Sequence, residues 1–140
     1  MPKERYRVVE HTADIGIEAF GLTLLELFAN AAWGLTDTLT DAAAVRECES
    51  REIQVSAQDR SELLIAWLSE LLYLFDTERK LFCRSEILNL TTNALHARVH
   101  GETFDPVRHA IRHDVKAVTY HGIEIQGRPG SWKATVIFDI

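Results

Sequence analysis

Residues that cross-link or interrupt small folds are scarce in this sequence, which has two cysteines, three prolines and seven glycines in 140 residues. Cys48 and Cys83 are too few and too far apart for a zinc framework. We expect two reduced thiols, as is usual in the cytoplasm, with a disulfide between them as the alternative. Because no linker, repeat or low-complexity tract interrupts the chain, we expect a single domain over residues 1–140.

Long apolar runs are also missing. No segment approaches the ~20 apolar residues that a membrane-spanning helix requires. The start of the chain alternates polar and apolar residues and lacks the basic start and apolar stretch of a signal peptide. We therefore expect a cytoplasmic protein that does not associate with membranes.

Basic residues are outnumbered by acidic ones, 15 to 21, and the formal net charge is -6 at pH 7. Binding to nucleic acid gains much of its affinity from Lys and Arg side chains that neutralise phosphates. We therefore expect no direct high-affinity binding of nucleic acid. The acidic excess suits cations or a basic protein partner, although a merely soluble surface would explain it as well.

The common enzyme motifs are absent too. The sequence contains no glycine-rich phosphate loop, no G-x-S-x-G turn, no H-E-x-x-H helix and no C-x-x-C pair. This absence argues against an enzyme, but it leaves open an unusual metal-dependent hydrolase.

Alternating apolar residues indicate strands along much of the chain. Two strands are predicted between Arg5 and Phe20, with a break near His11–Asp14. In the last strand, Trp132, Ala134, Val136 and Phe138 share one face. This last strand covers residues 132–140, and the other predicted strands cover residues 48–57, 82–90, 94–101 and 115–125.

Two segments have helical periodicity. Thr23 and Glu26 form a capping-box pattern before the first, and Thr36–Arg46 is expected to be a polar connection after it. Asp59 or Ser61 caps the second, whose apolar band is too wide for a surface helix and therefore predicts the centre of the core. The pattern as a whole predicts an α+β fold, in which antiparallel or mixed sheet layers pack with two main helices.

Two acidic clusters are candidates for a metal site. Asp14 lies in the break between the first two strands, and the chain ends with the Asp139 side chain and the Ile140 carboxylate. A divalent ion held by these three residues suits Ca²⁺ better than Zn²⁺, with Mg²⁺ or Mn²⁺ as alternatives. Asp14 could instead be a turn residue and the chain end could fray, but the strand pattern that continues to the last residue argues against fraying.

Histidines and a lysine offer further candidates. The spacings of His100, His109, His113 and His121 match no zinc pattern, so we expect most of them to be exposed or hydrogen-bonded. His121 follows Thr119-Tyr120 at a predicted strand end, where it could join a polar site or face solvent. Lys116 could lie on a solvated strand face, or it could contact a nucleotide phosphate or an acidic partner. Arg108 and His109 allow the same two interpretations.

Several blocks, taken in order, resemble the archease family. They are Glu10-His11-Thr12-Ala13-Asp14-Ile15-Gly16, Ala19-Phe20-Gly21, Leu25-Glu26-Leu27-Phe28-Ala29, Leu68–Tyr73, Gly101-Glu102, Val115–His121 and Phe138-Asp139-Ile140. The resemblance covers essentially the whole chain, with similar spacings. It is weakest over Asp41–Arg51 and Thr103–His113.

The resemblance implies an accessory protein that is not itself a ligase. It implies an activator of the RtcB-type tRNA-splicing RNA ligase, which promotes guanylylation and repeated turnover of that enzyme. The family's metal ligands correspond to Asp14, Asp139 and Ile140, and His11, Lys116 and His121 would support the site or contact the partner. The alternatives are a small phosphoester hydrolase with His11 or His121 as its base, and a chaperone-like interaction protein for RNA-modifying enzymes.

Overall fold

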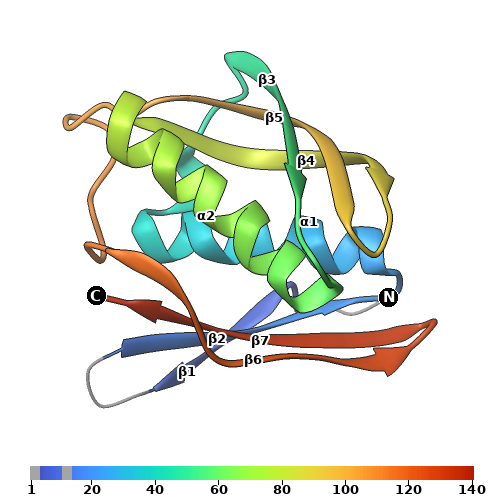
Figure 1. Ribbon diagram of the computed structural model, residues 1–140. Coiled ribbons are helices and arrows are strands. Elements are labelled where there is room, and N and C mark those ends of the chain that lie inside the picture. Colours follow the sequence, from blue (N-terminus) through green and yellow to red (C-terminus); the bar gives the residue numbers. More distant parts are fainter. Residues whose placement is uncertain (1–3, 11–13) are drawn as a thin grey trace.

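The computed structural model describes residues 4–10 and 14–140. Two antiparallel sheets enclose two long helices, which contact both sheets (Figure 1). The four-stranded sheet has the order β1-β2-β7-β6, and the three-stranded sheet has the order β3-β5-β4. The predicted α+β class is confirmed, and both sheets are antiparallel throughout.

The four-stranded sheet joins the two ends of the chain. Its strands are β1 (Tyr6–Glu10), β2 (Asp14–Gly21), β6 (Ala117–Arg128) and β7 (Ser131–Asp139). As predicted, Ala134, Val136 and Phe138 are fully buried and lie on the face that covers the helices. The alternate residues of β2 and β7 face away from the helices because side chains alternate along a strand.

The three-stranded sheet lies on the other side of the helices. It consists of β3 (Glu49–Ser56), β4 (Lys80–Leu90) and β5 (Ala94–Thr103), with β5 in the centre. Two register shifts interrupt β4, between Phe82 and Arg84 and between Ile87 and Asn89. The arrangement leaves β4 at one edge of this sheet.

The first helix begins where the sequence predicts, and the second begins after Asp59, one of its two predicted caps. The Thr23 hydroxyl accepts the Glu26 N–H at 3.1 Å at the start of α1 (Leu24–Leu39). The Asp59 carboxylate does the same for the Glu62 N–H at the start of α2 (Arg60–Glu78). The wide apolar band of α2 is buried against both sheets, which confirms that this helix is the centre of the core.

The predicted connection at Thr36–Arg46 is wrong in its first half. Helix α1 continues to Leu39, and Ala42–Ala44 form a short 3₁₀ turn. The buried hydroxyls of Thr36 and Thr38 donate to the carbonyls of Phe82 and Gly34, both at 2.7 Å. These bonds allow a polar sequence to continue the helix inside the core, because a buried hydroxyl is tolerated when it is hydrogen-bonded.

The structure bears on two further expectations, one about the cysteines and one about membranes. Cys48 and Cys83 are both free thiols. Burial is the main cause of a raised pKa for the Cys83 thiol, so this side chain stays protonated and behaves as a packing residue. Within the described residues, neither helix combines the length and the apolar character needed to cross a membrane.

Candidate functional site

Three strands meet at one end of the four-stranded sheet. Strand β2 begins at Asp14, β7 ends at Asp139 and β6 begins at Ala117. The register pairs Asp139 with Asp14 on one side and with Ala117 on the other. The end of the chain therefore lies between the starts of two neighbouring strands (Figure 1).

Asp14 and Asp139 are direct cross-strand partners on the same face of the sheet. Both lie on the face away from the helices, because their neighbours Ile15 and Phe138 follow the alternation of the core face. Directly opposed residues of antiparallel strands have Cβ atoms about 4.5–5.5 Å apart. Among the described residues, neither carboxylate has a salt bridge or a side-chain hydrogen bond. Two like charges directly opposite one another are destabilising, and a bound cation would reverse that effect.

The main chain fixes this chain end. The Lys116 N–H donates to the Asp139 carbonyl at 2.7 Å, which extends the contact between β6 and β7 by one residue. Ile140 follows directly and is 37% exposed. The main chain of Asp139 is therefore held on both sides, by β2 and by β6.

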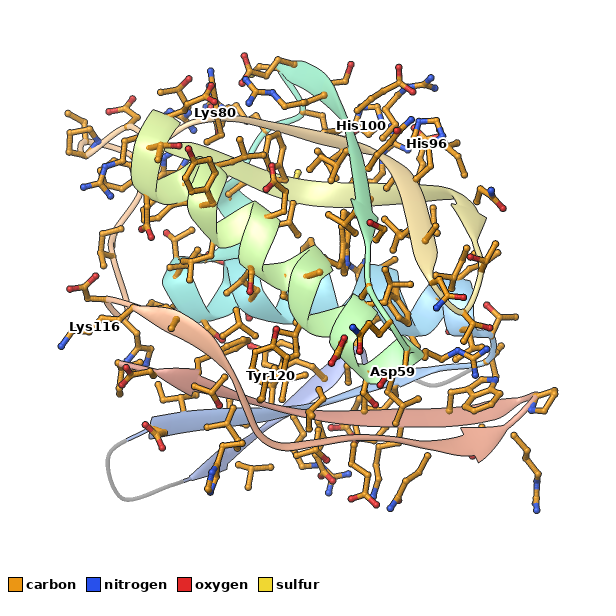
Figure 2. All side chains as sticks on the ribbon, viewed as in Figure 1. Asp59, Lys80, His96, His100, Lys116 and Tyr120 are labelled. Atoms are coloured by element: carbon orange, nitrogen blue, oxygen red, sulfur yellow. The ribbon has the colours of Figure 1, made fainter. Side chains whose placement is uncertain are left out.

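The supporting residues predicted from the sequence lie at different distances from this pair. Lys116 is exposed beside the chain end and its side chain extends away from the body of the molecule (Figure 2). His121 is exposed within an irregular part of β6, between Thr119 and Glu124, where the register with β7 shifts. It is not in register with the two aspartates. His11 lies outside the described residues.

The donor set at this end consists of oxygen atoms. No group of three or more His, Cys, Asp or Glu side chains is arranged to hold a metal ion in the part of the chain that the structure describes. The two aspartate side chains supply carboxylate oxygens here, and the sequence-based prediction adds the main-chain carboxylate of Ile140. Such a set fits hard cations such as Ca²⁺ and Mg²⁺, which bind oxygen, and lacks the His and Cys ligands that zinc prefers.

Among the described residues, the histidines do not gather into a metal-binding group. The His100 ring is hydrogen-bonded to Glu86 at 2.5 Å, and His113 and His121 are exposed. His109 is buried and bonded to Glu102 at 3.0 Å. The prediction that most of them are exposed or hydrogen-bonded is confirmed.

The buried carboxylate of Glu102 is the main polar centre that the sequence did not reveal. It is 6% exposed and accepts the Arg46 N–H at 2.8 Å, the Arg108 guanidinium and His109 Nε2. Burial raises the pKa of this carboxyl, but the three hydrogen bonds outweigh that effect and hold the pKa below its usual range. Arg108 and His109 therefore belong to a hydrogen-bonded network within the fold, and the interpretation of a solvated strand face is wrong for both.

The tautomer of His109 follows from its two contacts. The Asp105 N–H donates to Nδ1 at 2.8 Å, so Nδ1 carries no proton. Nε2 therefore carries the proton and donates to Glu102. The ring is neutral, and the Arg108 guanidinium is the only charged partner of Glu102 among the described residues. Glu102 comes before the Asp105-Pro106 turn, and Arg108 and His109 come after it. Local sequence patterns do not indicate that these three side chains meet.

Comparison with known families gives the family of this chain. The model of the Archease protein family (MTH1598/TM1083) matches residues 6–140. The chain belongs to the archease family. The archease of Methanosarcina mazei is 36% identical over the full length of both chains, and that of Thermococcus gammatolerans is 39% identical, covering 97% of this chain and 99% of that protein.

Two solved structures share the fold of this chain. The solution structure of protein 1598 from Methanobacterium thermoautotrophicum has a TM-score of 0.79 and 35% sequence identity, covering 97% of this chain and 99% of that one. The crystal structure of an archease from Thermotoga maritima, described as a possible chaperone, has a TM-score of 0.61 and 20% identity, with 96% of both chains covered. This second similarity concerns the fold alone.

Proposed function

We propose that this archease-family chain activates an RtcB-type RNA ligase of tRNA splicing by promoting guanylylation of that enzyme. The observation that supports the proposal is the pairing of Asp14 with Asp139 at the end of the sheet, in a chain whose family match includes both residues. Two carboxylates that face each other without a described cationic partner are poor structural elements and good cation ligands.

The site would hold one divalent cation, most readily Ca²⁺, with Asp14, Asp139 and the Ile140 carboxylate as its protein ligands. Such an ion, when bound, neutralises and orients phosphate oxygens. The protein residues contribute position: the β2–β7 register sets the two aspartates opposite each other, and the Lys116 N–H holds the Asp139 backbone at 2.7 Å.

Lys116 is the side chain best placed to reach beyond this site. It is exposed, extends away from the sheet and forms no ion pair with a described carboxylate (Figure 2). A lysine in this setting can contact a nucleotide phosphate or an acidic group of the ligase. His121 and His11 remain candidates for partner contacts.

The decisive experiment is guanylylation of the cognate ligase with radiolabelled GTP, with and without this protein. We expect the wild-type chain to accelerate labelling, and the Asp14→Asn variant and a variant lacking Ile140 to lose most of that acceleration. Glu18→Gln is the matched control, because Glu18 lies on the same strand and the same face but pairs with Thr135 away from the chain end.

The outcomes separate the alternatives. Equal acceleration by Asp14→Asn and wild type would exclude a role for the acidic site while keeping the activator function. No acceleration by the wild-type chain would reject the activator function. Release of phosphate from a simple phosphoester by the isolated protein, lost in Asp14→Asn, would establish the hydrolase instead.

A further inference from the structure

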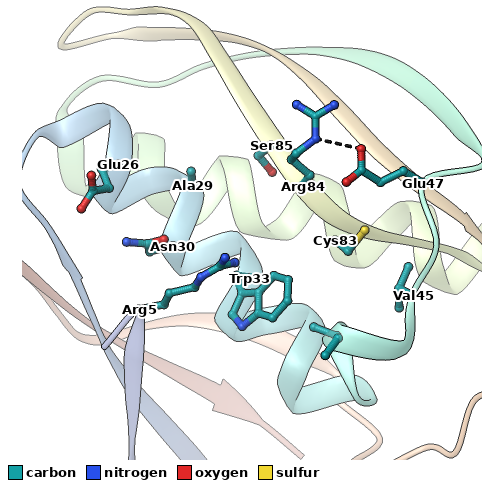
Figure 3. Close-up of a pocket in the computed structure, with 12 residues that line it drawn as sticks. Arg5, Glu26, Ala29, Asn30, Trp33, Val45, Glu47, Cys83, Arg84 and Ser85 are labelled. Atoms are coloured by element: carbon teal, nitrogen blue, oxygen red, sulfur yellow. Dashed lines mark hydrogen bonds and ion pairs between the residues drawn. The ribbon is translucent and has the colours of Figure 1, made fainter. Parts of the chain in front are cut away.

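A groove lies between α1 and the outer edge of β4 and is lined by neither Asp14 nor Asp139. Its larger part has a volume of about 830 Å³ and lies between the exposed side of α1 and strand β4. Figure 3 shows Asn30 and Trp33 of α1 on one side and Arg84 and Ser85 of β4 on the other.

The groove continues toward the start of α1. A second cavity of about 570 Å³ is lined by Leu24 and Leu25 of α1, Leu88–Leu90 of β4 and Arg60 of α2. The two cavities follow one another along the same pair of elements, because α1 and β4 run in opposite directions. At ~3.3 Å per residue, the β4 segment from Cys83 to Leu90 is about 25 Å long.

The strand that borders this groove is open to pairing. Strand β4 has one neighbour, β5, and therefore one edge without a partner strand. Between its two register shifts, Arg84–Ile87 pair regularly with β5. The unpaired N–H and C=O groups of a regular edge segment are a template for an added strand.

Two leucines border the second cavity and are unusually exposed. Leu25 and Leu88 each have 45% of their surface accessible, on α1 and β4 respectively. Leucines that face each other across a groove gain stability when an apolar side chain covers both. The groove therefore favours an occupant with apolar side chains in part of its length.

Two positive charges of the groove have no described ionic partner. The Arg5 guanidinium lies 4.0 Å from the centre of the Trp33 ring and forms no ion pair with a described carboxylate. Arg60 likewise has no described ionic partner, and its buried Nε has no hydrogen-bond partner. Of the two groove carboxylates, Glu47 pairs with Arg84, whereas Glu26 accepts the Leu22 N–H and forms no ion pair with a described cation.

We propose that this groove binds an extended, acidic segment of a partner protein, which adds to the β4 edge as a further strand. Main-chain hydrogen bonds to Arg84–Ile87 supply the pairing. Carboxylates of the segment contact Arg5 and Arg60, and an apolar side chain covers Leu25 and Leu88. An acidic peptide is favoured over RNA because the exposed cations are few and a sheet edge recognises a polypeptide backbone.

The test uses the full chain and a defined probe. The probe is an acetylated, amidated eight-residue peptide in which Glu alternates with Val and Leu, and its control carries Lys in place of Glu. Heteronuclear NMR follows the amide signals and their hydrogen exchange during titration. We expect shifts at Arg84–Ile87 and along α1, slower exchange of β4 edge amides, and weaker binding of the Lys peptide.

Variants then test the charges. Arg5→Gln combined with Arg60→Gln is expected to lower the affinity for the Glu peptide by about tenfold, the size expected for two partly exposed ion pairs. Arg98→Gln combined with Arg128→Gln removes the same charge outside the groove and should leave the affinity unchanged.

Three outcomes would overturn the proposal. One is the absence of β4 shifts at millimolar peptide. Another is protection of β4 amides that rises with protein concentration alone, which would make a second copy of this chain the occupant. The third is stronger β4 perturbation by a single-stranded oligonucleotide than by the Glu peptide.

Discussion

The carboxylate of Glu102 and those of the Asp14–Asp139 pair lie in opposite environments. Glu102 is buried and accepts hydrogen bonds from the Arg46 backbone, Arg108 and His109. Asp14 and Asp139 face each other across two strands and receive no hydrogen bond or salt bridge from a described side chain. The Glu102 carboxylate has its hydrogen-bond donors within the chain, whereas the Asp14 and Asp139 carboxylates can bind a cation from outside it.

This difference separates a structural role from a functional one. A buried carboxylate that is fully hydrogen-bonded contributes to stability, and its removal leaves its donors without partners. Two opposed carboxylates reduce stability unless a cation lies between them. The two regions should therefore respond in opposite directions to truncation of their carboxylates.

The largest effect is expected for Glu102→Ala. This change leaves a buried N–H, a histidine Nε2–H and a guanidinium without their acceptor, and we expect the free energy of unfolding to fall by about 3 kcal/mol. Urea denaturation at neutral pH measures it. Glu124→Ala, at an exposed position of β6, is the control and should change stability by less than about 0.5 kcal/mol. Equal effects of the two substitutions would show that the Glu102 network contributes nothing.

The next effect in size is stabilisation by calcium. At a free concentration one hundred times its dissociation constant, a ligand that binds the folded state alone raises the free energy of unfolding by about 2.7 kcal/mol. We expect thermal unfolding of the wild-type chain to shift upward when calcium replaces a chelator, and Asp139→Asn to lose that shift. Glu18→Gln should keep it. A shift of equal size in Asp139→Asn would place the cation elsewhere.

The sequence indicated where Asp14 and Asp139 lie, but it did not indicate the buried network of Glu102; the metal site itself stays a prediction. The alternating pattern of the last strand and the break before Asp14 place both aspartates at strand ends, and the fold then brings them into register. No local pattern indicates that Glu102 accepts from residues on both sides of the Asp105-Pro106 turn and from Arg46. Those contacts depend on how the loop that follows β5 folds back against this strand.

The same limit explains the misplaced end of the first helix. Thr36 and Thr38 are weak helix formers, so the sequence predicts a connection there. The helix continues because the Thr36 hydroxyl reaches the Phe82 carbonyl, a contact with a strand that lies 46 residues away in sequence. The open edge of β4 is likewise a property of strand order, which periodicity does not determine.

A smaller effect is expected from pH. Hydrogen bonds hold the pKa of Glu102 below its usual value of 4.5 in the folded chain, so the unfolded chain binds this proton more readily. The resulting stability is fully present above about pH 4.5 and is lost as the pH falls through the folded pKa. In urea denaturation, the stability difference between wild type and Glu102→Gln should therefore be smaller at pH 3.5 than at pH 7. A difference that stays constant would contradict the proposed network.

The smallest effect, and the one with the opposite sign, is expected for Asp14→Asn in the presence of a chelator. This substitution removes one of two opposed negative charges while keeping the size of the side chain, and the free energy of unfolding should rise by about 0.5 kcal/mol. Added calcium should reverse the order, because the wild-type chain then gains stability and the variant does not. Thermal unfolding of both proteins in chelator and in calcium tests the reversal. A variant that is less stable than wild type in both conditions would mean that Asp14 has a structural role, and the contrast with Glu102 would then disappear.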